Sequence, residues 1–153
     1  MGCCFYLGAL IGGASRDQQD LFYEFGKNLG IAFQLHDDIL DAYAGDKSSF
    51  GKQVGGDILS NKKTILLIKA LQNANQLQRE ELMQWLKTKE FNKENKVIAV
   101  KGLFNATNAL KEAENEQKEY FQKALLALES LRLDESKKQS LKVFASDLMH
   151  RTK

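Results

Sequence analysis

The sequence has 153 residues, of which 43% are hydrophobic and 27% are charged, and its formal net charge is +2. This length and composition are those of an ordinary globular chain that can bury a substantial core. A net charge this small indicates neither a nucleic-acid partner nor an anionic membrane surface.

The amino-terminal segment, residues 2–14, is apolar but much shorter than the roughly 20 residues that a transmembrane helix needs. No positive charge precedes it, as one would in a signal peptide, so we predict no transmembrane segment and interpret the run as the end of a buried helix. A chain that starts so abruptly in apolar sequence is expected to be cut from a longer protein. Cys3 and Cys4 match neither a disulfide framework nor a metal-ligand spacing, so we expect buried thiols in a reducing, cytoplasmic setting.

Helical periodicity dominates the rest of the chain, and the sequence contains no proline that would interrupt a helix. Ser15 and Gln18 have the spacing of a capping box, which predicts a helix from there to about Tyr43. Residues 44–56 are rich in glycine, aspartate and serine and are predicted to form a loop. Further helices are predicted at about 58–74, 78–89, 92–106, 108–131 and 136–150. We therefore predict a single all-α domain over residues 1–153.

Several of these helices carry an apolar stripe at three- and four-residue steps, which is typical of a core-facing surface. The stripes consist of Leu21, Phe25, Leu29, Ala32 and Phe33; of Leu82, Trp85 and Leu86; of Val97, Val100 and Phe104; and of Tyr120, Phe121, Ala124, Leu125 and Leu128. We interpret them as packing surfaces and not as parts of a cofactor site.

The first long helix departs from this pattern in its last part, FQLHDDILD at residues 33–41. Asp37 and Asp41 lie one helical turn apart, and Asp38 lies about 100° round the helix from Asp37. Like charges at this spacing repel, and carboxylates near a helix carboxyl end oppose the macrodipole. A hard divalent cation such as Mg²⁺ would relieve this conflict, because it takes oxygen ligands and retains waters. A solvated stripe of surface carboxylates is the alternative. We interpret His36 as structural.

Glycine and lysine follow the acidic helix in the order Gly51-Lys52, then Gly55-Gly56-Asp57, and then Asn61-Lys62-Lys63-Thr64 at the opening of the next helix. Glycines let a loop approach a ligand closely, and helix starts attract phosphate. Lysines hold phosphate oxygens through charge-assisted hydrogen bonds. Carboxylates for a metal and lysines for a diphosphate therefore lie close together in the sequence.

The stretch FQLHDDILDAYAGDKSSFGKQVGGDILSNKKT, residues 33–64, resembles the second aspartate-rich region of the trans-prenyl diphosphate synthases, which make farnesyl, geranylgeranyl and longer diphosphates. The opening YLGALIGGAS resembles the family helix that precedes this region. The final Arg151-Thr152-Lys153 resembles the basic tail that closes the active site. The resemblance implies a helical bundle of the isoprenoid synthase type, of which this chain holds the last six or seven helices.

The resemblance also implies Mg²⁺ as cofactor, with an allylic diphosphate and isopentenyl diphosphate as substrates. The implied site residues are Asp37, Asp38 and Asp41 for the metal; Lys52, Lys62, Asp57, Arg151 and Lys153 for the substrate diphosphate; and Lys52, Lys62 and Gln34 as catalytic residues. Within the metal site, Asp37 corresponds to a direct ligand, whereas Asp38 and Asp41 orient ligands and waters. Gln34 corresponds to a residue that lines the allylic pocket near the reacting carbon.

The sequence departs from the family because the first aspartate-rich motif, its arginine pair and the isopentenyl diphosphate site are absent. Asp17 and Asp20 are the only aspartates before Asp37 in the sequence, and they do not form this motif. Groups that act as a unit do not contribute additively, so we predict a prenyltransferase fragment that is inactive alone. The resemblance implies that the full-length enzyme forms a homodimer.

A non-catalytic partner subunit of a synthase is the main alternative, although retention of the whole second region argues against it. An unrelated helical bundle with two metals usually has Glu-x-x-His pairs, and none is present. A terpene cyclase typically has an Asn-Ser-Glu type of second motif in place of DDxxD.

Overall fold

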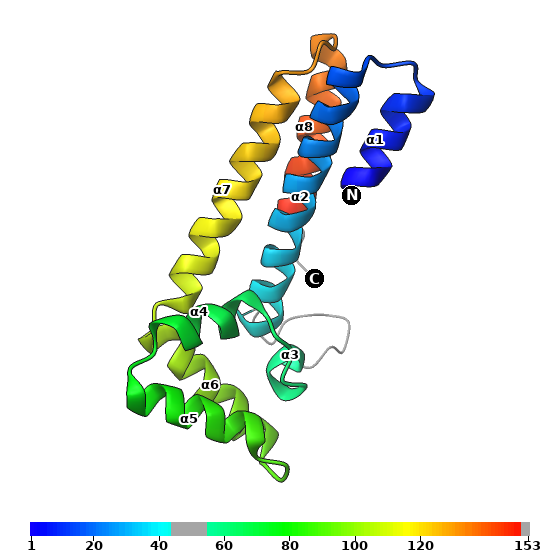
Figure 1. Cartoon of the computed structure of the whole chain (residues 1–153). Helices are drawn as coiled ribbons and strands as arrows, with labels where there is room; N and C mark the ends of the chain where they lie inside the picture. The colour runs from blue at the N-terminus through cyan, green and yellow to red at the C-terminus, as the bar shows by residue number, and fades with distance from the viewer. Residues whose placement is uncertain (44–54, 151–153) are drawn as a thin grey trace. The chain divides into compact units, whose positions relative to one another are not determined.

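The computed structural model describes residues 1–43 and 55–150, and every regular element in these ranges is an α-helix (Figure 1). The helices are α1 (Gly2–Ile11), α2 (Arg16–Tyr43), α3 (Gly56–Leu59), α4 (Ile65–Asn73), α5 (Gln76–Lys87), α6 (Lys93–Ala106), α7 (Ala109–Glu129) and α8 (Glu135–Met149). The predicted all-α class is confirmed. Within the same ranges, none of these helices combines the length and the apolar character that crossing a membrane requires.

The described chain forms two compact units. The first contains residues 1–36 and 116–150, and the second contains the described residues between 37 and 115. Helices α2 and α7 each begin in one unit and end in the other. Each unit has a core of its own. The single domain over residues 1–153 therefore stays a prediction.

In the first unit, α2, α7 and α8 pack around one apolar cluster (Figure 1). Its buried members are Phe25 and Leu29 of α2, Ala124 and Leu128 of α7, Leu131, and Ala145 of α8. The alanines allow the helices to approach closely around the larger side chains. The core faces predicted for α2 and α7 are confirmed in this cluster.

Helix α1 packs on α2 through a narrow stripe of its surface. Phe5 meets Phe25 edge to face, with 4.9 Å between the ring centroids, and Gly2 and Ala9 are buried. Positions 2, 5 and 9 recur at three- and four-residue steps, so they share one helix face. Cys3 and Cys4 lie off this face and are exposed. The predicted burial of both thiols was wrong for that reason.

The predicted start of α2 is confirmed within one residue, but Gln18 does not serve the helix as a capping box would require. Its side-chain oxygen accepts the backbone N–H of Arg132 at 2.7 Å. Gln18 therefore connects α2 to the segment between α7 and α8, which lies 114 residues away in the sequence.

In the second unit, α6 packs against α3, α4 and α5. The cluster that they enclose includes Ile58, Leu66, Leu82, Val100 and Phe104, all of them buried. The core faces predicted at Leu82 and at Val100 are therefore confirmed.

The continuous helix predicted over residues 58–74 was wrong, because a turn at residues 60–64 separates α3 from α4. Asn61 occupies the left-handed region with φ 55°, which no helix interior tolerates. Thr64 then opens α4 as its N-cap, and its hydroxyl oxygen accepts the N–H of Leu67 at 3.4 Å. The site residue Lys62 thus lies in a turn and not on a helix.

Tyr43, the last residue of α2, is attached to α6. Its hydroxyl donates to the Oδ1 of Asn105 at 2.7 Å, and the ammonium of Lys101 lies 5.0 Å from the centre of its ring. Burial raises the pKa of Tyr43 to about 12, and the nearby Glu114 acts in the same direction. The carboxyl end of α2 is therefore fixed to the core of the second unit by a neutral phenol.

We expect Tyr43 to make stability depend on alkaline pH. The phenol of an unfolded chain ionises near pH 10, whereas the folded phenol stays neutral to about pH 12. Its stabilisation is complete below about pH 10 and is lost as the pH rises towards about 12. Urea unfolding at about pH 9 and about pH 11 should show a smaller loss of stability for Tyr43→Phe than for the wild type. Tyr120→Phe, at another tyrosine under a lysine, is the control. An undiminished loss in Tyr43→Phe would contradict this assignment.

We expect Gly26→Ala to destabilise the packing of α1 on α2. A Cβ on Gly26 would lie 2.5 Å from Phe5 and 3.1 Å from the backbone of Gly2, so α1 must shift. Gly30→Ala is the matched control on the same helix, because its nearest neighbour is the flexible side chain of Met1 at 3.3 Å. Alanine favours a helix over glycine by about 1 kcal/mol, so Gly30→Ala should be neutral or stabilising in thermal unfolding. Equal effects of the two substitutions would refute the close approach.

Candidate active site

The acidic end of α2 receives the first N–H groups of two later helices. The Oδ2 of Asp41 accepts the N–H of Asp57, in α3, at 2.8 Å. The Oδ2 of Asp38 accepts the N–H of Ile65, the first residue of α4, at 3.3 Å. Helix starts carry unpaired N–H groups and partial positive charge. The protein itself therefore offsets part of the repulsion between these carboxylates.

Lys62 adds a full positive charge beside Asp38 and Asp57. Its ammonium lies 2.7 Å from the Oδ2 of Asp57 and 3.4 Å from the Oδ1 of Asp38. The hydrogen bond to Asp57 raises the pKa of Lys62, and the charge of Asp38 acts in the same direction. Asp38 is only 6% exposed, whereas the side chain of Lys62 is about half exposed. The cation thus stays charged at the surface of an otherwise buried acidic contact.

Gly55 is required at the start of α3 for two reasons. It has φ 78°, a conformation that side chains other than glycine rarely adopt, and a Cβ there would lie 2.9 Å from the side chain of Val97 in α6. Its N–H donates to the backbone oxygen of Asp41 at 2.8 Å. Gly55 therefore lets α3 begin directly against α2.

The structure brings together four of the predicted site residues in the second unit, namely Asp38, Asp41, Asp57 and Lys62. Asp37 is half-buried on α2, and Gln34 is exposed on the same helix. Lys52, Arg151 and Lys153 lie outside the described residues. Their proposed contacts with a diphosphate therefore stay predictions.

The carboxylates of α2 offer the kind of oxygen donor that Mg²⁺ prefers. Carboxylate oxygens one turn apart, as in Asp37 and Asp41, suit a Mg²⁺ ion that retains waters and binds phosphate oxygens. Asp38 suits it less well as a direct ligand, because its oxygens already receive Lys62 and the N–H of Ile65. Within residues 1–43 and 55–150, no three histidine, cysteine, aspartate or glutamate side chains converge on one point.

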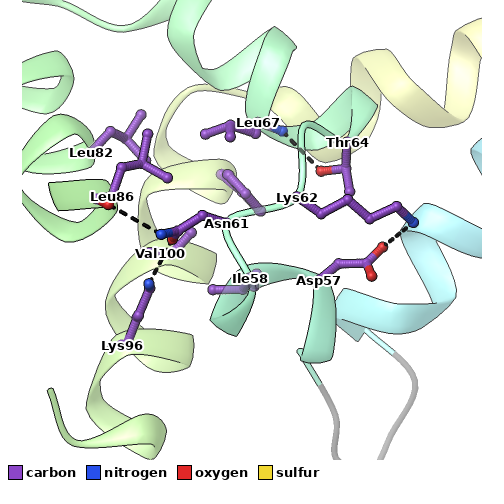
Figure 2. A pocket seen from close by; sticks show the side chains of 11 residues that line it. Asp57, Ile58, Asn61, Lys62, Thr64, Leu67, Leu82, Leu86, Lys96 and Val100 are labelled. Atoms are coloured by element: carbon purple, nitrogen blue, oxygen red, sulfur yellow. Dashed lines mark hydrogen bonds and ion pairs between the residues drawn. The ribbon is translucent and has the colours of Figure 1, made fainter. Parts of the chain in front are cut away.

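Lys96 and Asn61 belong to this region, and the sequence analysis missed both. Lys96 of α6 is fully buried, and its ammonium donates to the Oδ1 of Asn61 at 2.7 Å (Figure 2). With Asp57 and Lys62 they line a cavity of about 20 Å³, which leaves room for roughly one water molecule. Lys96 lies four residues before Val100, on the apolar stripe of its helix. A charged residue on that stripe was the feature of the sequence that could have identified it.

His36 lies in the first unit beside α7. Its Nδ1 is 3.3 Å from the amide nitrogen of Gln117, which therefore donates to it and leaves the proton on Nε2. This Nε2 is buried with no hydrogen-bond partner among the described residues. The contact with α7 supports the structural interpretation of this histidine.

The fold and these side chains define a helical protein with carboxylates and a lysine at the junction of three helices. The polyprenyl synthetase family model matches residues 1–104, which include all of these groups. The chain belongs to the polyprenyl synthetase family.

Curated relatives carry the same similarity. The geranylgeranyl diphosphate synthase of Sulfolobus acidocaldarius is 44% identical over 88 residues, which are 58% of this chain and 26% of the relative. The octaprenyl diphosphate synthase of Haemophilus influenzae is 32% identical over 123 residues, which are 80% of this chain and 36% of the relative. The chain thus matches only a quarter to a third or so of the length of these relatives.

Solved structures match almost the whole chain. A geranylgeranyl pyrophosphate synthase structure superposes with a TM-score of 0.87 and 39% identity, over 99% of this chain and 47% of that one. A polyprenyl synthetase from Streptomyces coelicolor A3(2) gives a TM-score of 0.87 with 25% identity, over 96% and 45% of the two chains. The predicted isoprenoid synthase type of fold is confirmed, for a chain that spans about half the length of these structures.

We expect the two outer aspartates of the acidic stripe to differ in their effect on stability. Asp41→Ala leaves the N–H of Asp57 without its acceptor and should lower the free energy of unfolding by about 1–2 kcal/mol. Asp37→Ala removes a repelling charge from the same helix and should change it by less than about 0.5 kcal/mol. Chemical denaturation without added metal measures both. A larger loss for Asp37→Ala than for Asp41→Ala would contradict the assigned roles.

Proposed function

We propose that the chain carries the second aspartate-rich half of a trans-prenyl diphosphate synthase active site. In the complete site, the allylic C–O bond would break and release diphosphate, the double bond of isopentenyl diphosphate would form a new C–C bond with the allylic carbon, and a proton would then be lost. The observation that carries this proposal is the position of Lys62 between Asp38 and Asp57 at the acidic end of α2. These residues lie within the match to the polyprenyl synthetase family, and similar proteins are named as prenyl diphosphate synthases.

The proposed role of Lys62 is to hold the oxygens of the allylic diphosphate. Its pKa is raised, so it remains positively charged at neutral pH and can stabilise negative charge as it develops on the leaving group. Asp57 and Asp38 orient the ammonium. In this proposal Lys52, Arg151 and Lys153 add further positive charge to the same diphosphate, and Gln34 faces the allylic carbon.

The α2 carboxylates are proposed to hold magnesium. Asp37 serves as a direct ligand, whereas Asp38 and Asp41 orient ligands and waters while they accept N–H groups from α4 and α3. Bound Mg²⁺ supplies positive charge that favours departure of the diphosphate. The half-exposed Lys62 is able to reach a diphosphate without losing its contact with Asp57, because an ammonium has three donors.

We further propose that this chain alone has no prenyl-transfer activity, because its sequence contains only one aspartate-rich motif. Carboxylates from one helix cannot enclose a diphosphate together with its metal ions, and groups that act as a unit lose most of their effect when half are missing. The full-length enzyme is proposed to act in the cytoplasm as a homodimer.

Isothermal titration of the chain with Mg²⁺ and inorganic diphosphate tests the half-site. We expect binding that requires both components and that weakens about 10- to 100-fold in Lys62→Met, which loses a charge-assisted hydrogen bond. Asp37→Asn should weaken it similarly. Asp17→Asn, the same substitution at the other end of α2, is the matched control and should bind like the wild type.

Two outcomes would contradict the proposal. If Lys62→Met and Asp37→Asn bind Mg²⁺ and diphosphate as tightly as the wild type, the diphosphate does not bind at these residues. Turnover of an allylic diphosphate with radiolabelled isopentenyl diphosphate by the purified chain, without an added protein, would refute the proposed inactivity.

A further inference from the structure

Lys96 is a lysine with no access to solvent, on a helix whose other buried residues are apolar. It is 0% exposed and lies among the largest fully buried side chains of the described protein. Its ammonium contacts the Oδ1 of Asn61 at 2.7 Å and lies 4.1 Å from the centre of the Phe91 ring. Among the described residues, the side chain is therefore held by a hydrogen bond to Asn61 and a cation–π contact with Phe91.

Burial of this charge is unfavourable for folding. Desolvation lowers the pKa of Lys96, as expected for an ammonium removed from water. Replacement of all members of a buried ion pair by apolar side chains of similar volume is often neutral or stabilising, whereas removal of one member leaves its partner unsatisfied. A methionine would fill the same space without a buried charge but would leave the Oδ1 of Asn61 without its donor, so the contribution of a lysine at this position lies in its contact with Asn61.

The partner of Lys96 occupies a strained position. Asn61 has φ 55°, which asparagine tolerates better than most residues. Its side chain bridges two helices, because its Oδ1 accepts from Lys96 of α6 and its Nδ2 donates to the backbone oxygen of Leu86 of α5 at 3.1 Å. The turn between α3 and α4 is thereby fixed to the core from one side (Figure 2).

The next residue after Asn61 is Lys62. The N–H of Lys62 donates to the backbone oxygen of Asp57 at 2.9 Å, and its ammonium reaches the carboxylates of Asp57 and Asp38. Figure 2 shows the two lysines on opposite sides of the turn, one bonded to Asn61 and the other to Asp57. Because the two residues are adjacent, a change in the backbone of Asn61 would also move the backbone of Lys62.

We propose that Lys96 is a positioning residue that acts through Asn61 to hold the turn at residues 60–64, and so directs the ammonium of Lys62 towards the diphosphate. The inference rests on the proposed function in one respect, the binding of diphosphate by Lys62. It assigns to the buried lysine of α6 a role in substrate binding without any contact with substrate.

Lys96→Met tests the proposal with two measurements. Amide hydrogen exchange by NMR should show the N–H of Lys62 exchanging about tenfold faster, with the core N–H of Phe104 unchanged. Titration with Mg²⁺ and inorganic diphosphate should show about tenfold weaker binding. Lys138→Met is the matched control, because Lys138 is also buried but donates to Glu129 in the first unit. It should change neither quantity.

A double-mutant cycle tests whether Lys96 acts through Asn61. Asn61→Gly keeps the left-handed backbone accessible but removes both side-chain hydrogen bonds, and should accelerate exchange at Lys62 by a similar factor. The addition of Lys96→Met to Asn61→Gly should then have no further effect. Asn108→Gly is the control, because Asn108 has φ 56° elsewhere in the same unit, and it should leave Lys62 and diphosphate binding unchanged.

The outcomes separate this inference from the proposed function. Unchanged exchange at Lys62 in Lys96→Met, or additive effects in the cycle, would overturn the positioning role. If exchange at the N–H of Phe104 accelerated as much as at Lys62, the positioning role would also be overturned, because Lys96 would then stabilise the whole core. Faster exchange at Lys62 alone, in a chain whose wild type binds no diphosphate, would support the positioning of the turn and overturn the proposed function of Lys62.

Discussion

The ammonium of Lys62 lies 2.7 Å from Asp57 and 3.4 Å from Asp38, and these two contacts connect α2, α3 and the turn before α4. Each of the three segments is constrained to make them possible. Helix α2 must end in carboxylates, α3 must begin at a glycine against α2, and the turn must take a left-handed residue. The charges alone would repel one another at the end of α2. The lysine and the two helix starts make the arrangement stable enough to fold.

Most of the fold was predictable because apolar periodicity is a property of the sequence itself. The bounds of α5, α6, α7 and α8 lie within about two residues of the predicted ones, which is the usual uncertainty of helix ends. The break between α3 and α4 was not predictable by the same means. It depends on Asn61, whose backbone conformation is fixed by contacts with Leu86 and Lys96 that only the folded chain provides.

The site was predictable in part, for a related reason. The spacing of Asp37, Asp38 and Asp41 on one helix follows from the sequence, and so does the proximity of glycine and lysine. From the sequence, a divalent cation was predicted to relieve the repulsion. In the structure, Asp38 accepts the N–H of Ile65 and contacts Lys62, and Asp41 accepts the N–H of Asp57. The thiols of Cys3 and Cys4 were misplaced because an all-apolar segment does not reveal which face of a helix is buried.

The contacts that build the site join residues that are close in the sequence. The hydrogen bond between Asp41 and Asp57 spans 16 residues, the contact of Asp38 with Lys62 spans 24, and that of Asp38 with Ile65 spans 27. Closure of such short loops costs little chain entropy and is fast. The core of the first unit, by contrast, joins α2 to helices near the other end of the chain. During synthesis from the amino terminus, the residues that form these three contacts are therefore all made well before α8, which completes the core of the first unit.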